Sequence, residues 1–228
     1  MSRPGKGPKR LTPKLLLRAY AAGIFPMAES RHADAIFWVD PELRGILPLE
    51  TFHVPRSLRK KVSRNVFDVR CDTACDAVIH ACAARARGRR DSWINDEIIE
   101  AYAELHDMGF VHSVETWQDG RLVGGLYGVA LGGAFFGESM FSTVTDASKV
   151  ALVHLVARLR RGRFVLLDSQ FVTDHLRQFG VVEIPAREYL TRLEDALKIR
   201  AVFYSALEPW EVDAALAEVF EQSRTQMS

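Results

Sequence analysis

Residues 110–142 read FVHSVETWQDGRLVGGLYGVALGGAFFGESMFS, and this stretch decides the fold. It is rich in β-branched and aromatic residues, which are typical of strands. Gln118-Asp119-Gly120 and Leu131-Gly132-Gly133 are typical of tight turns, in which glycine adopts a positive φ without strain. The pattern therefore predicts a three-stranded meander, with strands at residues 110–117, 121–130 and 134–142.

The residues after the meander predict a long helix and another strand. Thr145 is placed to cap an amphipathic helix that ends at Gly162. The nearly all-apolar segment 164–168 follows, as is typical of a strand buried on both faces of a sheet. A long helix between two strands implies a right-handed parallel crossover. We therefore expect an α+β fold, an acetyltransferase-like mixed sheet flanked by helices.

The first 64 residues differ from the rest in charge and in pattern. They carry 13 Lys/Arg against 5 Asp/Glu, whereas residues 65–228 carry 17 against 24. Residues 24–66 also hold four prolines and show little periodicity. We predict a small basic N-terminal domain at 1–64 and an acetyltransferase-like domain at 65–228, whose C-terminal helical extension begins at Pro209.

Composition narrows the class of protein. The chain has 228 residues, of which 48% are hydrophobic, so it can bury a sizeable core and is not disordered as a whole. No apolar run approaches the ~20 residues that cross a bilayer, so we expect no membrane partner. Three cysteines without a CxxC motif favour a reducing compartment, and the cytoplasm is the expected location.

Two basic clusters are candidates for phosphate contacts. Neither has the interleaved aromatic residues of a base-stacking surface, so both fit binding of a nucleic-acid backbone without base readout. A solvated basic face explains them equally well, and the sequence leaves this open. The clusters are Arg56, Arg59, Lys60, Lys61 and Arg64, and then Arg85, Arg87, Arg89 and Arg90.

Several common site motifs are absent. The sequence has no P-loop, GxGxxG fingerprint, HExxH, nucleophile elbow or zinc-type cluster, so we expect neither metal hydrolysis nor a Ser-His-Asp hydrolase. Six of the 15 glycines lie between Gly124 and Gly137. Glycines in strands mark either close packing or a nearby ligand, and both interpretations stay open.

Two polar positions within apolar surroundings are candidate site residues. Glu138 lies among aromatic residues, where a carboxylate is costly to bury unless an internal Arg or a ligand pairs with it. Asp168 and Gln170 follow the apolar strand, at the strand end where open sheets form sites. Two residues apart in extended backbone, they are expected to point the same way and to position an amine and a carbonyl. A turn Asp beside a surface Gln is the alternative.

Several longer motifs closely resemble the bacterial leucyl/phenylalanyl-tRNA–protein transferase family. The resemblance runs in order from about residue 12 to residue 197, and the remaining C-terminal stretch falls outside it. The motifs are Tyr20-Ala21-Ala22-Gly23-Ile24-Phe25-Pro26-Met27, Trp38-Val39-Asp40-Pro41, Arg44-Gly45-Ile46-Leu47-Pro48, Phe136-Gly137-Glu138-Ser139-Met140-Phe141-Ser142 and Leu167-Asp168-Ser169-Gln170-Phe171.

The resemblance implies an aminoacyltransferase. Such an enzyme moves Leu or Phe, and sometimes Met, from aminoacyl-tRNA to the N-terminal Arg or Lys of an acceptor protein. The product is marked for degradation by the N-end rule. The family has a small N-terminal domain and an acetyltransferase-like catalytic domain that does not use coenzyme A. No metal or diffusible cofactor is implied.

The resemblance also implies roles for individual residues. The catalytic pair would be Asp168 and Gln170, with Asp168 orienting Gln170 and Gln170 contacting the attacking amine. Glu138 would be the carboxylate at the pocket mouth, and Trp38 and Trp93 would lie near the terminal adenosine. The pocket for the Leu or Phe side chain would be lined by Phe135, Met140, Leu152, Leu155, Leu159 and Leu167.

Two other function classes compete with this interpretation. A coenzyme-A-dependent N-acyltransferase would need a Gly-rich loop before the long helix, but Thr143-Val144-Thr145-Asp146 stands there, with a carboxylate that repels phosphate. A non-catalytic module that binds N-terminal Arg or Lys would use Glu138 but would leave Gln170 and the basic residues without a role.

Overall fold

The meander forms as predicted, with β5 (Val111–Gln118), β6 (Arg121–Leu131) and β7 (Ala134–Ser142). Asp119 and Gly120 adopt positive φ in the first turn, and Gly132 does so in the second. Both turns thus use residues that tolerate left-handed backbone. The computed structural model describes residues 11–84 and 91–225.

The long helix and the strand after it are also present, with shifted ends. α5 spans Ala147–Arg161 and ends at Gly162 as predicted. Thr145 is not its cap: Asp146 takes that position, with a φ of 70°, while its carboxylate pairs with Lys61 and Lys149. β8 spans Leu166–Gln170, two residues later than expected, and pairs in parallel with β7.

The remaining elements place helices on both faces of the main sheet. The other strands are β1 (Phe25–Ala28), β2 (Ile36–Val39), β3 (Leu43–Ile46), β4 (Asp68–Cys71) and β9 (Val182–Pro185). The other helices are α1 (Pro13–Ala21), η1 (Leu49–Thr51), α2 (Arg56–Ser63), α3 (Cys75–Ala83), α4 (Asp96–Asp107), α6 (Asp174–Arg177), α7 (Ala186–Leu197) and α8 (Pro209–Thr225).

The seven-stranded sheet has the order β4-β5-β6-β7-β8-β3-β9, and β1 and β2 form a separate hairpin. Every described pairing in the large sheet is antiparallel except that of β7 with β8. The expected α+β class with a mixed sheet is therefore confirmed. β3 lies between β8 and β9, so part of the N-terminal segment completes the main sheet. The domain boundary at residue 64 stays a prediction.

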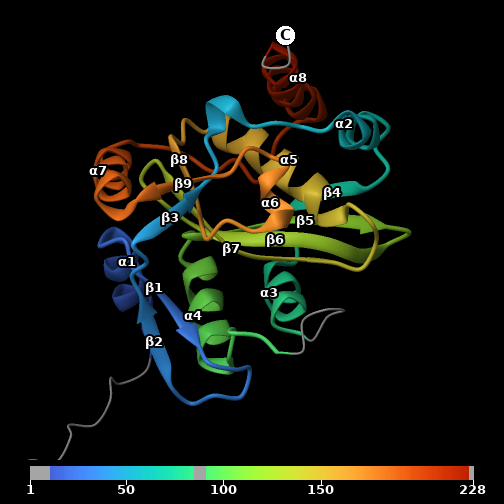
Figure 1. Cartoon of the computed structure of the whole chain (residues 1–228). Helices are drawn as coiled ribbons and strands as arrows, with labels where there is room; N and C mark the ends of the chain where they lie inside the picture. The colour runs from blue at the N-terminus through green and yellow to red at the C-terminus, as the bar shows by residue number, and fades with distance from the viewer. Residues whose placement is uncertain (1–10, 85–90, 226–228) are drawn as a thin grey trace, which may run out of the picture.

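Two apolar clusters form the core, one on each face of the sheet (Figure 1). α3 and α4 cover one face, and α5 crosses the other, with α2 and α8 packed on it. Cys75 and Cys82 are buried on α3, and both thiols are free. The C-terminal extension is α8, which buries Ala215, Leu216 and Val219 against this layer. No helix in the described ranges is long and apolar enough to cross a bilayer.

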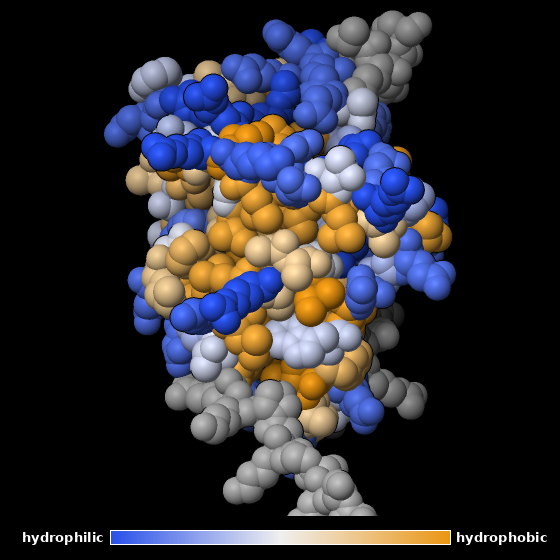
Figure 2. Space-filling model, turned by 90° about the vertical axis from the view of Figure 1, so that its left-hand side faces the viewer, coloured by the Kyte–Doolittle hydropathy of each residue, from blue (hydrophilic) through white to orange (hydrophobic). Residues whose placement is uncertain are grey.

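One outer face of the molecule is rich in apolar residues (Figure 2). It is the side that carries α1 and α7, next to the sheet edge formed by β9. Leu43, Val182 and Leu190 are exposed apolar side chains on β3, β9 and α7. This exposed apolar surface therefore lies next to the edge of the sheet at β9.

The glycines of the meander serve mainly close packing. A Cβ on Gly124 would lie 2.5 Å from the Cβ of Ala147, where α5 begins. A Cβ on Gly128 would lie 2.3 Å from the carbonyl oxygen of Phe136. Gly137, the residue opposite Gly128, has room for a Cβ and lines a cavity. Close packing therefore explains Gly124 and Gly128, whereas a ligand close to Gly137 stays a prediction.

This pair of facing glycines gives a stability test. Gly128→Ala is expected to lower the free energy of unfolding by roughly 1–3 kcal/mol, because the new methyl group overlaps rigid backbone. Gly137→Ala is the matched control and should change it by no more than about 0.5 kcal/mol. Urea denaturation followed by circular dichroism measures both, and equal losses would contradict the packing argument.

Candidate active site

A cavity of about 860 Å³ lies where β7, β8 and α5 meet. Glu138, from the middle of β7, lines it together with Asp168 and Gln170, from the end of β8. The structure therefore brings the three predicted polar residues to one cavity. Its apolar lining includes Met140, Leu152, Leu155 and Leu167.

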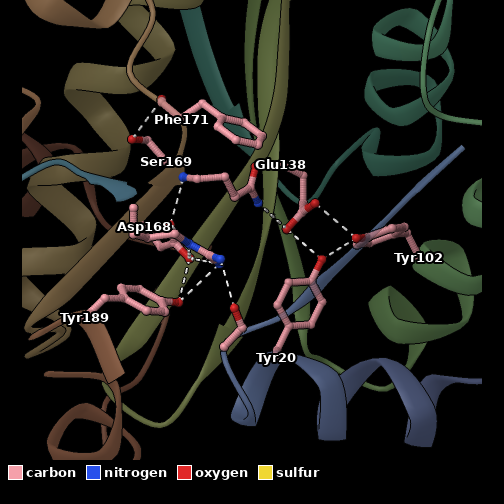
Figure 3. Close-up of polar contacts among 10 residues, drawn as sticks. Tyr20, Tyr102, Glu138, Asp168, Ser169, Phe171 and Tyr189 are labelled. Carbon is pink, nitrogen blue, oxygen red and sulfur yellow. Dashed lines mark hydrogen bonds and ion pairs between the residues drawn. The ribbon is translucent and has the colours of Figure 1, made fainter. Parts of the chain in front are cut away.

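Asp168 is completely buried, and a guanidinium holds its carboxylate (Figure 3). Arg44 Nε donates to Oδ1 and Oδ2 at 3.0 and 3.1 Å, and Nη2 donates to Oδ2 at 2.6 Å. The Tyr189 hydroxyl donates to Oδ2 at 2.7 Å, and the backbone N–H of Gln170 donates to Oδ1 at 2.8 Å. Because these bonds occupy both oxygens, Asp168 is suited to positioning its neighbours.

Arg44 is itself fixed on all sides. It is 1% exposed, and Nη1 donates to the carbonyl oxygen of Gly23 at 2.8 Å. Its guanidinium lies 4.6 Å from the ring centre of Phe25 and 4.4 Å from that of Tyr189. A buried ion pair is tolerated only when each charge is paired and its other groups are satisfied, and this pair meets both conditions.

Gln170 turns its side chain away from Asp168 and toward Glu138. Its φ of 61° is in the left-handed region, so the extended backbone expected at this residue ends before it. Gln170 Nε2 donates to Glu138 Oε1 at 3.2 Å. The expectation that the Asp168 and Gln170 side chains share a direction is therefore wrong: Asp168 binds the main chain of Gln170. The amide oxygen of Gln170 has no partner among the described residues and stays available to a ligand.

Glu138 is bound by two tyrosines rather than by an arginine (Figure 3). The Tyr20 hydroxyl donates to Oε1 at 2.7 Å, and the Tyr102 hydroxyl donates to Oε2 at 3.0 Å. The two hydroxyls also contact each other. The internal Arg considered as a partner of Glu138 pairs with Asp168 instead.

The protons in this group can be counted. Three oxygen–oxygen contacts join Tyr20, Tyr102 and Glu138, but two tyrosines supply two hydroxyl protons. A proton on Glu138 provides the third when one tyrosine accepts from the carboxyl and donates to the other tyrosine, so the three contacts together favour the neutral carboxyl. Burial acts in the same direction, and the pKa of Glu138 is raised to about 7. The hydrogen bonds from the two tyrosines lower this pKa, and the nearby Asp168 carboxylate adds a smaller rise. Glu138 is thus suited to exchange a proton near neutral pH.

Three of the residues implied to bind substrate lie outside the lining of this cavity. Phe135 is buried in the core, where its ring packs against Phe164 and Phe203. Leu159 lies one helical turn beyond Leu155 and is also completely buried. Trp38 is half-buried on β2, opposite Pro26 of the β1–β2 hairpin. Trp93, by contrast, lines the cavity.

The first basic cluster lies on α2 and on Arg64, the residue that ends it, and divides into two groups. Lys61 pairs with Asp146 at 2.7 Å, and the guanidinium of Arg59 lies 5.6 Å from the ring centre of Phe220. Arg56, Lys60 and Arg64 are exposed and have no partner among the described residues. The second cluster, Arg85, Arg87, Arg89 and Arg90, lies outside the described residues.

Four important residues had no assigned role in the sequence analysis. Arg44 and Tyr20 lie within motifs quoted for the family resemblance, but no local pattern connects them to Asp168 or Glu138. Tyr102 and Tyr189 are on helical faces that fit an ordinary core. The one local signal was Arg44 itself, a charged residue next to the apolar Ile46-Leu47.

Two family models match the chain. The model of the leucyl/phenylalanyl-tRNA protein transferase N-terminal domain matches residues 9–42, and the model of leucyl/phenylalanyl-tRNA protein transferase matches residues 46–194.

Curated relatives from the same family match this chain over most of their length. The leucyl/phenylalanyl-tRNA–protein transferase of Paramagnetospirillum magneticum is 62% identical over 203 residues, which cover 89% of this chain and 97% of the relative. That of Nitrobacter winogradskyi is 61% identical over 85% of this chain and 86% of the relative. That of Caulobacter vibrioides is 57% identical over 83% of this chain and 87% of the relative. The chain therefore belongs to the leucyl/phenylalanyl-tRNA–protein transferase family.

Proposed function

We propose that the chain transfers Leu or Phe from aminoacyl-tRNA to the N-terminus of an acceptor protein that begins with Arg or Lys. The product would be marked for N-end-rule degradation. The observation that carries this proposal is the Glu138–Gln170 hydrogen bond at the wall of the cavity, beside apolar residues. Polar groups suited to the acceptor's amine and an apolar lining suited to the transferred side chain thus occur in one cavity.

The reaction needs little chemical activation from the protein. The α-amine nitrogen of the acceptor forms a bond to the ester carbonyl carbon, and the bond to the ribose oxygen of the tRNA breaks. One proton leaves the amine, and one reaches the ribose oxygen. Since the ester is already reactive, placing the amine against it supplies much of the rate.

The free amide oxygen of Gln170 is suited to accept a hydrogen bond from the attacking amine. Asp168 fixes the backbone of Gln170 and acts as a positioning residue, because its oxygens are already bonded. Glu138 attracts the acceptor's amine or cationic side chain when it is ionised, and its pKa of about 7 lets it exchange protons there.

The apolar lining suits the side chain of the transferred amino acid. Leu152 and Leu155 come from one face of α5, and Met140 and Leu167 come from β7 and β8. A lining of this kind favours a flexible or planar apolar side chain. It discriminates against a misplaced methylene group by roughly 1–3 kcal/mol.

The exposed cations of α2 are suited to hold the tRNA. Arg56, Lys60 and Arg64 have no protein partner among the described residues, so their charges are available to phosphates. The coenzyme-A alternative is less favoured, because Asp146 stands at the start of α5 and already engages both neighbouring lysines.

The roles of Gln170 and Asp168 can be separated by two variants. Gln170→Asn tolerates the left-handed φ but withdraws the amide by one methylene group, so stability should change by less than about 1 kcal/mol while transfer falls roughly 100-fold. Asp168→Asn leaves the Arg44 charge uncompensated and should cost about 3–5 kcal/mol of stability. Transfer from radiolabelled leucyl-tRNA to an Arg-starting peptide, together with urea denaturation, measures both. Unchanged transfer by Gln170→Asn would contradict its role.

The pH dependence of acceptor binding tests Glu138. Its folded pKa of about 7 lies above the ordinary 4.5 of a glutamate side chain, so the side chain gains charge only as pH rises through about 7. The KM for the Arg-starting peptide should therefore fall about tenfold between pH 6 and pH 8. In Glu138→Gln the KM should be higher and lack this fall. An identical profile in both proteins would exclude Glu138 as the acceptor contact.

The salt dependence of tRNA binding tests α2. Lys60→Gln and Arg64→Gln should each weaken binding and reduce the slope of log affinity against log salt by about 1, since each removes one phosphate contact. Arg192→Gln on α7 is the control, because Arg192 already pairs with Glu188. Filter binding of tRNA at several salt concentrations gives the slopes, and equal slopes for all three variants would show α2 to be a solvated basic face.

A further inference from the structure

A second cavity, of about 680 Å³, shares no lining residue with the first. It is bounded by β4, the face of α5 that carries His154 and Arg158, and the segment that leads into α8. Since α5 also contributes Leu152 and Leu155 to the first cavity, one helix lines both.

Arg158 is a buried cation with too few partners. It is 4% exposed and lines this cavity. In the described part of the chain its one hydrogen bond runs from Nη1 to the carbonyl oxygen of His154, at a long 3.5 Å. Its Nε is buried without a partner, and no carboxylate lies within ion-pair distance.

The acidic residues around Arg158 are engaged elsewhere. Asp68 pairs with Arg70 at 2.6 Å, and the Asp72 carboxylate binds His112 and the backbone of Ser113. Cys71 also lines the cavity, but burial raises the pKa of its thiol to about 12, so it is neutral.

The other carboxylates do not supply a counter-ion either. Glu115 accepts hydrogen bonds from Thr73, Ala74 and Ser113. Asp213 lines the cavity but is exposed and forms no hydrogen bond or ion pair with Arg158. The guanidinium is therefore buried without a counter-ion among the described residues, and its Nε lacks a partner, an arrangement that costs free energy.

His154, one turn earlier on α5, is also a buried polar side chain that lacks a hydrogen-bond partner. It is 6% exposed, and its Nδ1 is buried without a hydrogen-bond partner. Burial and the nearby Arg158 lower its pKa to about 3, so the imidazole is neutral and can donate one hydrogen bond. Two unsatisfied polar side chains thus line the same cavity.

We propose that this cavity binds the carboxylate of a small apolar acid, with Arg158 as its counter-ion. The two oxygens of a carboxylate match the paired N–H donors of one guanidinium group. Phe67, Leu207 and Val212 supply apolar surface for the rest of the molecule. Asp68 and Asp213 also line the cavity and disfavour a ligand of higher negative charge, such as phosphate. The site is separate from the transfer reaction and does not depend on it.

The first test compares two ligands of equal shape on the unmodified protein. Phenylacetate should bind and raise the thermal unfolding midpoint, whereas the neutral phenylacetamide should bind about tenfold more weakly or not at all. Isothermal titration calorimetry measures the affinities. Equal effects of both compounds, no binding of phenylacetate, or stabilisation by inorganic phosphate without stabilisation by phenylacetate would each overturn the proposal.

The second test removes the charge. Arg158→Met keeps an unbranched apolar side chain, so without ligand it should be at least as stable as the parent, and phenylacetate should no longer raise its midpoint. Arg187→Met, on the exposed surface of α7, is the control and should keep the ligand response. A marked loss of stability in Arg158→Met, or a ligand response equal to the parent's, would show that Arg158 is not held for an anion.

Discussion

The buried ion pair between Arg44 and Asp168 is the interaction on which the first cavity depends. It joins β3 to the end of β8, and further hydrogen bonds attach the segment after α1, through Gly23, and α7, through Tyr189. Desolvation opposes such a pair unless every remaining donor and acceptor is satisfied. Here the neighbours satisfy them, and the same bonds set the backbone of Gln170. Fold and site therefore share one set of contacts.

The two carboxylates of the site have different surroundings and therefore different chemistry. Asp168 is held by a permanent cation, whereas Glu138 is held mainly by neutral hydroxyl and amide groups. Such contrasts are how proteins separate the roles of similar groups. Gln170 lies between them, bound through its main chain to one and through its side chain to the other. This arrangement supports a division into a fixed positioning acid and a proton-exchanging one.

Local signals in the sequence predicted much of the fold and part of the site. The meander, Gly162 at the end of α5 and the Pro209 helix follow from alternation, turn residues and caps, which act over a few residues. The position of β3 within the sheet depends on pairings with strands made much later, and no local pattern encodes them. Phe135 and Leu159, which the family resemblance implied as pocket residues, lie outside the lining of the first cavity. A buried strand or helix face does not show where along it the side chains border a cavity.

The insertion of β3 between β8 and β9 also sets an order of assembly during synthesis. Arg44 leaves the ribosome 124 residues before its partner Asp168. Until β8 and β9 follow, the nascent chain holds an unpaired cationic strand, and contacts so distant in sequence form slowly. Chains cut short within this interval lack the positioning acid altogether, so the transfer site can form only in polypeptides that extend past Gln170.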